Sequence, residues 1–154
     1  MPPAFAVERT LGRLGTWLRL MGFDTLLERD CARGEFPGRA AGRILLTRTR
    51  SRFERRQGGG AVFIASDDPA GQRVEVVRRC GLRVEDLRPF TRCLRCNDPI
   101  EPVARAEVER QVPDYVWETR ESFSRCPRCG RVYWRGTHTE RALNTVRRLF
   151  EEAG

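Results

Sequence analysis

The chain has 154 residues, 40% of them hydrophobic, which suffices for one ordinary domain or for a small domain with a metal-stapled module. No apolar run approaches the roughly 18 residues of a membrane span, and the N-terminus lacks the features of a signal peptide. We therefore expect a soluble, cytoplasmic protein with no membrane partner. The net charge is +8 and all 29 basic residues are arginine, which favours polyanions, above all nucleic acid.

Short apolar runs predict the strands of the first 90 residues. Four of them lie at 4–7, 25–27, 44–47 and 61–65, and 82–87 is a candidate for a last strand. These runs show little polar alternation, as expected for strands that are buried on both faces.

Helical patterns separate these runs. Apolar residues recur at helical spacing from Leu11 to Met21, and 74–80 also has a helical pattern. Gly34 and Pro37 keep any helix within 31–42 short. Strands that alternate with helices predict an α/β fold with a mainly parallel sheet covered on both faces.

The pattern changes near residue 90, so we divide the chain into an α/β domain at 1–90 and a smaller module at 91–154. In the second part, 122–125 and 132–134 resemble the two arms of a hairpin, and Thr137-x-x-Glu140 matches a capping box that opens a C-terminal helix. The first part carries a net charge of +6 and the second of +2, so most of the basic surface belongs to the α/β domain.

Two Cys-x-x-Cys pairs mark the second part. They comprise Cys93, Cys96, Cys126 and Cys129. Zn²⁺ prefers four tetrahedral ligands and thiolate sulfur is its favoured structural donor, so these residues predict one closed, structural zinc site. The long connection between the pairs indicates an insertion, and zinc should supply much of the folding free energy of this module.

Several carboxylates follow the predicted strands. Ligands of a parallel sheet bind beyond the carboxyl ends of the strands, where Glu8, Asp67 and Asp68 fall. Glu35 lies in the loop after the second strand. Acidic ligands of this kind hold Mg²⁺ or Mn²⁺ for phosphodiester hydrolysis, although such acids also serve as ordinary caps and ion-pair partners.

Arginines concentrate between Arg43 and Arg56, where six of them stand with one acid. This segment is either a phosphate-binding edge or a solvated helix face. The candidates for RNA binding are Arg13, Arg19, Arg48, Arg50, Arg52, Arg55 and Arg56.

The order of the motifs resembles the carboxy-terminal ribonuclease domain of the Mut-seven exonuclease. Matching segments run from Leu11 to Leu14, from Gly22 to Asp24, from Arg43 to Arg48, through both cysteine pairs, and from Tyr133 to His138. The resemblance covers nearly the whole chain and implies a PIN-like nuclease domain followed by a zinc ribbon with a C-terminal helix.

Three positions depart from that family. Glu8 stands where the family usually has Asp, while Thr49 and Arg33 stand where it usually has acids. Glu8 and Glu35 remain able to bind a cation, but a site with fewer carboxylates should bind Mg²⁺ more weakly. The resemblance therefore implies a ribonuclease-like protein with part of its catalytic carboxylates lost.

Three functions follow from these observations. The first is an RNA-binding protein that docks on RNA or on a ribonucleoprotein such as the ribosome. The second is an active Mg²⁺- or Mn²⁺-dependent ribonuclease in which Glu8, Glu35, Asp67 and Asp68 supply the ligands. The third is a non-enzymatic adaptor that binds proteins through the ribbon and the last helix.

Overall fold

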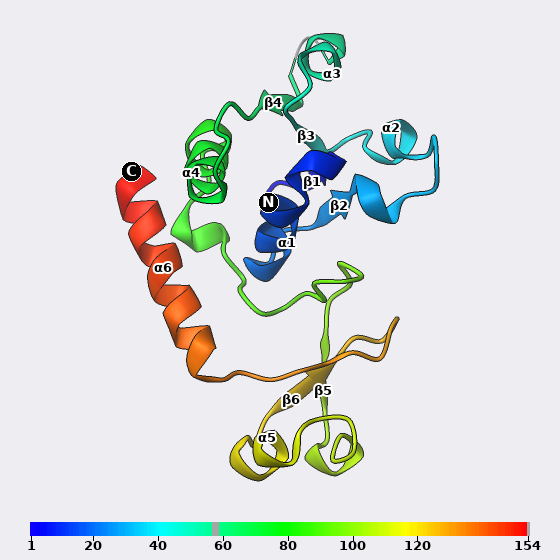
Figure 1. Cartoon of the computed structure of the whole chain (residues 1–154), viewed down its shortest axis with the longest axis vertical. Helices are drawn as coiled ribbons and strands as arrows, with labels where there is room; N and C mark the ends of the chain where they lie inside the picture. Colours follow the sequence, from blue (N-terminus) through cyan, green and yellow to red (C-terminus); the bar gives the residue numbers. More distant parts are fainter. Residues whose placement is uncertain (57–58, 154) are drawn as a thin grey trace.

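A four-stranded parallel sheet forms the centre of the larger part of the protein. The computed structural model describes residues 1–56 and 59–153 (Figure 1). The strands are β1 (Phe5–Val7), β2 (Thr25–Leu27), β3 (Ile44–Thr47) and β4 (Ala61–Phe63), in the order β2-β1-β3-β4. Val7 is level with Leu27 and Leu46, so the residues after these strands leave the sheet at one shared edge. The predicted α/β class and all four of these strands are confirmed.

Apolar side chains alternate between the two faces of this sheet. Phe5, Val7 and Leu46 belong to the main core, which also contains residues of α1 (Gly12–Leu20) and α4 (Pro69–Cys80). Ala6 and Leu45 instead face the short helix α2 (Phe36–Arg39) in a second, smaller cluster. Both faces are therefore covered, which explains why the strands show no polar alternation.

Local signals set the ends of the helices. The 3₁₀ turn Arg9–Leu11 leads into α1, and the 3₁₀ turn Glu28–Asp30 follows β2. Asp68 caps α4 by accepting a hydrogen bond from the Gly71 N–H at 2.8 Å, and Pro69 is the first helical residue. Gly81 ends α4 with a φ of 61°, a conformation that costs glycine little.

The predicted strand at 82–87 is wrong. After Gly81 the chain forms the 3₁₀ turn Val84–Asp86 and then runs back to the end of α1, where the Arg88 N–H donates to the Met21 carbonyl at 2.9 Å. Leu82 is buried in the main core, so the apolar pattern of this segment reflects packing and not pairing. The arginine-rich segment after β3 forms the helix α3 (Arg50–Arg55).

The second part contains an antiparallel sheet in the order β5-β6-β7. Its strands are β5 (Glu101–Val103), β6 (Phe123–Arg125) and β7 (Val132–Tyr133), and the predicted hairpin corresponds to β6 and β7. The insertion between the cysteine pairs holds the 3₁₀ turn Arg105–Glu107 and the helix α5 (Asp114–Thr119). Its own small core consists of Val108, Val112, Val116 and Phe123.

The C-terminal helix α6 (Thr137–Ala153) returns to the first part and lies along α4 (Figure 1). Val146, Leu149 and Phe150 join the main core, and such burial contributes about 1.5–3 kcal/mol for each large apolar side chain. The capping box is shifted from its predicted place, because the helix begins at Thr137 and Thr139 Oγ1 accepts from the Gly136 N–H at 3.1 Å. Among the residues described, no helix is both long and apolar enough to cross a bilayer.

Candidate functional site

Each cysteine pair lies on a tight turn with the same backbone geometry. In the first turn the Asn97 N–H donates to the Cys93 carbonyl at 2.8 Å, and in the second the Gly130 N–H donates to the Cys126 carbonyl at 2.9 Å. Asn97 and Gly130 both have left-handed backbones, with φ of 70° and 78°. Glycine and asparagine tolerate this conformation best, which explains their places one residue after each pair.

The two turns bring their four sulfurs together. All four Sγ atoms lie within 4.8 Å of one another, and Cys93 Sγ is 3.8 Å from Cys129 Sγ. Sulfurs at about 2.3 Å from a tetrahedral zinc ion lie roughly 3.8 Å apart, so the arrangement fits that ion. The predicted four-cysteine cluster is confirmed, and its geometry is consistent with a structural zinc site.

Hydrogen bonds to sulfur support this cluster from outside. Tyr133 Oη lies 3.1 Å from Cys93 Sγ and accepts from the Leu94 N–H at 3.0 Å, so its own hydroxyl hydrogen is free to point at the sulfur. Burial alone would raise the pKa of Cys93, but hydrogen bonds from Tyr133 and from the backbone of Cys96 and Arg95 outweigh it and lower the pKa to about 7. The same donors favour the thiolate that a metal requires.

The first cysteine turn is docked on the start of β2. Asn97 Oδ1 accepts from the Thr25 N–H at 3.0 Å, and Asn97 Nδ2 donates to Asp24 at 2.7 Å. Arg19, only 2% exposed, donates to the carbonyls of Leu94, at 2.9 Å, and of Thr25, at 3.0 Å. Arg19 was predicted to contact RNA, but the structure places its buried guanidinium at the junction between the two parts of the protein.

At the carboxyl edge of the sheet, Glu8 follows β1 and is buried. Its carboxylate accepts from the Arg48 N–H at 2.6 Å and from the hydroxyls of Thr10 and Thr49, each at 3.0 Å. Burial by itself would raise the pKa of Glu8, but these hydrogen bonds outweigh it and hold the pKa below its usual value. Glu8 is thus an anion with most of its acceptor capacity already used.

Arg52 of α3 bridges Glu8 to a second carboxylate, Glu28. Its guanidinium donates to Glu8 Oε2 at 3.2 Å and to the two oxygens of Glu28 at 3.0 and 2.7 Å. These hydrogen bonds lower the pKa of Glu28 against the effect of burial. Glu28 was not among the predicted acids, although it follows β2 directly, as Glu8 follows β1, and the same rule applied to both strands identifies it.

The remaining predicted acids do not join this pair. Glu35 is exposed, with its Oε2 3.3 Å from the Ala32 N–H and 3.9 Å from Arg39. Asp67 is 94% exposed and pairs with Arg48, while Asp68 serves as the cap of α4. Within the described residues these three acids do not converge with Glu8 into one group, and the turn before α4 commits Asp68 to the helix and leaves Asp67 in solvent.

The described residues do not fit a catalytic Mg²⁺ or Mn²⁺ site. Within them the four cysteines are the one group of three or more potential ligand side chains that converge. Mg²⁺ is usually held by one or two carboxylates, with waters and substrate phosphates completing its octahedron, but the guanidinium of Arg52 already lies between the two carboxylates of this edge.

The arginines of α3 and its neighbours divide into two kinds. Arg48 donates to the carbonyls of Ile64 and Ser66, and Arg56 donates to those of Ala40, Arg43 and Gly60, so both hold the fold together. Three of the predicted RNA-binding residues are exposed, namely Arg13, Arg50 and Arg55. Arg50 lies over the ring of Phe63, with 4.7 Å between the guanidinium carbon and the ring centroid.

Comparison with known proteins identifies one match. The family model described as the Mut7-C RNAse domain matches residues 3–146, which span both cysteine pairs and the carboxyl edge. Neither the curated proteins nor the solved structures contain a match to this chain.

Proposed function

This chain belongs to the Mut7-C RNAse domain family, and from that premise we propose that it binds RNA without cleaving it. In this proposal the PIN-like domain keeps an RNA-binding surface, its carboxyl edge holds no catalytic cation, and the four cysteines hold one structural Zn²⁺. RNA itself or a ribonucleoprotein such as the ribosome is the partner.

The observation that carries the proposal is the position of Arg52 between Glu8 and Glu28. A guanidinium keeps its charge at every physiological pH, so it permanently offsets one of the two negative charges and occupies the space between the carboxylates. A divalent ion would have to displace Arg52 from both carboxylates before it could bind them. Binding of such an ion is therefore expected to be weak.

The zinc ion has a structural role in this proposal. Four thiolates complete its tetrahedral shell, so no position remains for a water molecule or a substrate. What the ion supplies when bound is a fixed junction between the two cysteine turns, one of which carries the contacts of Asn97 to the sheet.

Arginine-lined surfaces support the RNA partner. A polar cleft of about 590 Å³ between β2 and the first cysteine turn is lined by six arginines and three aspartates. Some of these arginines are committed to ion pairs, such as Arg43 with Asp24 at 2.8 Å, but Arg95 at the rim is exposed. The guanidinium groups of Arg95, Arg13, Arg50 and Arg55 can each donate two hydrogen bonds to one phosphate.

A binding and cleavage assay tests the proposal. Purified protein is incubated with labelled single-stranded RNA and Mn²⁺, beside Glu8→Gln and the matched variant Glu118→Gln, which changes an exposed acid on α5. We expect binding that weakens as salt rises, and no cleavage by any of the three proteins. Arg50→Ala should make the negative slope of log affinity against log salt concentration less steep by about 0.7, the value for one lost phosphate contact. Arg110→Ala, in the insertion, should leave this slope unchanged.

Two other outcomes identify the alternatives. Mn²⁺-dependent cleavage that is lost in Glu8→Gln and kept in Glu118→Gln would establish an active ribonuclease and refute the proposal. Affinity that does not change between low and high salt, or no binding at all, would exclude the RNA partner and leave the protein-binding adaptor.

A further inference from the structure

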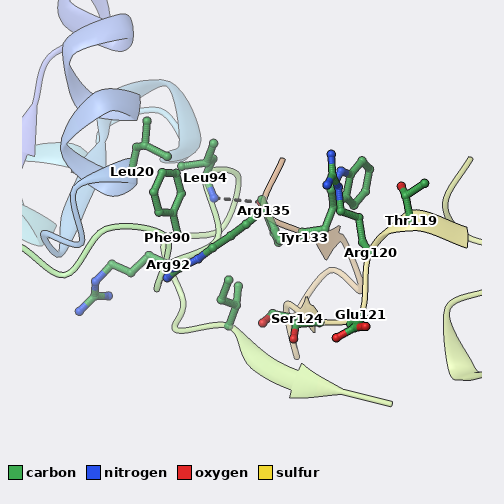
Figure 2. Close-up of a pocket in the computed structure, with 13 residues that line it drawn as sticks. Leu20, Phe90, Arg92, Leu94, Thr119, Arg120, Glu121, Ser124, Tyr133 and Arg135 are labelled. Atoms are coloured by element: carbon green, nitrogen blue, oxygen red, sulfur yellow. Dashed lines mark hydrogen bonds between the residues drawn. The ribbon is translucent and has the colours of Figure 1, made fainter. Parts of the chain in front are cut away.

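A second cleft, distinct from the carboxyl edge, lies between the two parts of the protein. It measures about 540 Å³ and is bounded by the end of α1, the linker before the first cysteine turn and the antiparallel sheet. Figure 2 shows Leu20, Phe90 and Leu94 on one side and Thr119, Arg120 and Ser124 on the other. A cavity of this size accommodates a small organic ligand or a nucleotide.

Phe90 forms one wall of this cleft in a strained backbone conformation. Its φ is 62°, in the left-handed region that a bulky side chain adopts at a cost of about 1–2 kcal/mol. The hydrogen bond from its N–H to the Leu20 carbonyl, at 3.0 Å, holds the residue there. Strain of this kind accumulates at binding sites, where the position of one side chain matters more than local stability.

The opposite wall is tied to the cysteine cluster. Tyr133 lines the cleft, and its hydroxyl is held between the Leu94 N–H and Cys93 Sγ. Trp134 follows it along the chain and also lines the cleft. Hydrogen bonds thus hold the backbone of Phe90 and the hydroxyl of Tyr133 in place, which reduces the entropy lost when a ligand binds.

Cationic side chains surround these rings. The guanidinium of Arg135 lies over the ring of Phe90, 5.4 Å from its centroid. Neither Arg135 nor Arg120 forms an ion pair with any described residue, and Glu121 is the one acid in the lining. Arg92, by contrast, is engaged by the carbonyls of Gly22 and Asn97. The cleft therefore combines flat aromatic walls with an excess of positive charge.

We propose that this cleft binds unstacked bases of single-stranded RNA, with the rings of Phe90 and Tyr133 stacking on bases and Arg120 and Arg135 contacting the flanking phosphates. The inference rests on the proposed RNA binding and assigns it a second location. Bases of single strands stack on aromatic rings and guanidinium planes, and every base has such a face. An apolar peptide would use the rings but would leave the two cations without partners.

The cleft is well separated from the carboxyl edge. Glu8 lies near the start of α1 and Leu20 at its end, and a helix of nine residues is about 13 Å long. Bases held in the cleft are therefore kept a helix length away from Glu8. This separation agrees with a site that captures RNA and does not present it for cleavage.

Substitutions of Phe90 test the proposal. Phe90→Leu keeps apolar bulk and the backbone cost but removes the flat ring, while Phe90→Trp keeps a ring. The matched control is Tyr115→Leu, which removes a 69% exposed aromatic side chain on α5, outside the cleft. The assay is fluorescence anisotropy with a labelled 12-nucleotide single strand and with the corresponding RNA duplex, and thermal melts check that each variant is folded.

We expect Phe90→Leu to weaken binding of the single strand between about 5-fold and about 140-fold, which is the range for losing one base–aromatic stack. Phe90→Trp and Tyr115→Leu should bind as the wild type does, and binding of the duplex should be unchanged in all variants. Arg135→Gln should weaken the single-strand complex and reduce its salt dependence.

The outcomes separate this inference from the proposed function. If the wild type binds RNA and Phe90→Leu binds the single strand equally well, the cleft is not the base-binding site, although RNA binding stands. If Phe90→Leu weakens the duplex as much as the single strand, base stacking is refuted. If the wild type binds neither RNA, the proposed function and the inference fail together.

Discussion

Replacing Arg52 with methionine removes the cation between Glu8 and Glu28 while a long, helix-favouring side chain stays on α3. The wild-type guanidinium makes three hydrogen bonds to these carboxylates, at 3.2, 3.0 and 2.7 Å, and its side chain is 35% exposed. Exposed ion pairs are worth about 0–1 kcal/mol, whereas loss of one partner from a buried pair costs about 3–5 kcal/mol. Because this bridge is half-buried, we expect Arg52→Met to lower the free energy of unfolding by about 2 kcal/mol at pH 7.

The dependence of this cost on pH gives the sharper test. The pKa values of Glu8 and Glu28 are both lowered in the folded protein, so their stabilising effect is present above their unfolded pKa and is lost as the pH falls through the folded pKa. Without Arg52 the folded pKa of both groups rises. The difference in stability between wild type and Arg52→Met should therefore shrink as the pH falls from 7 towards 3.5.

Denaturant unfolding across this pH range measures the effect. Arg55→Met, an exposed substitution on the same helix, is the control and should cost less than about 0.5 kcal/mol. In thermal melts at pH 7 the expected difference corresponds to about 4–8 °C. The reasoning is refuted if Arg52→Met is no more costly than Arg55→Met, or if its cost is the same at both ends of the pH range.

Three further substitutions test the metal centre, the junction and a close backbone approach. Cys129→Ser should abolish stoichiometric zinc binding, measured by atomic emission, and should remove hydrogen-exchange protection from the antiparallel sheet. Protection that persists in this variant would contradict a structural role for the ion. Arg19→Met should lower the free energy of unfolding, measured in denaturant, by roughly 3–5 kcal/mol, because buried carbonyls lose their donor. Arg13→Met on the same helix is the control and should lower it by less than about 0.5 kcal/mol. Gly22→Ala should lower the free energy of unfolding by at least about 2 kcal/mol, since the new Cβ would lie 2.2 Å from a backbone oxygen. Gly42 also has a left-handed backbone but faces open space, so Gly42→Ala should lower the free energy of unfolding by only about 1 kcal/mol.

Much of the fold could be predicted because its signals are local. The strands are short apolar runs that have helices on both faces, and the cysteine spacing alone specifies two turns around one ion. The strand predicted at 82–87 failed because an apolar pattern records burial and not the partner that causes it. Leu82 and Leu87 pack on the main core without pairing with any strand.

The carboxyl edge was less predictable because its chemistry depends on distant contacts. Glu8 could be placed by its position after β1, and the same reasoning would have found Glu28. That Arg52 reaches both depends on the direction of α3, across 44 and 24 residues of sequence, and no local pattern encodes it. For Asp68 a signal was present, since an aspartate before a proline is typical of a helix start and predicts a cap in place of a metal ligand.

The docking of the first cysteine turn also has a consequence for solubility. Because β2 is an outer strand, the outward N–H and carbonyl of Thr25 could otherwise pair with a strand of another molecule. Asn97 and Arg19 occupy these two groups, and Asn97 keeps its place through the turn that the metal would organise. Without the metal ion, the outer edge of β2 would therefore expose unpaired backbone groups. The protein would self-associate through this edge before the central sheet unfolds.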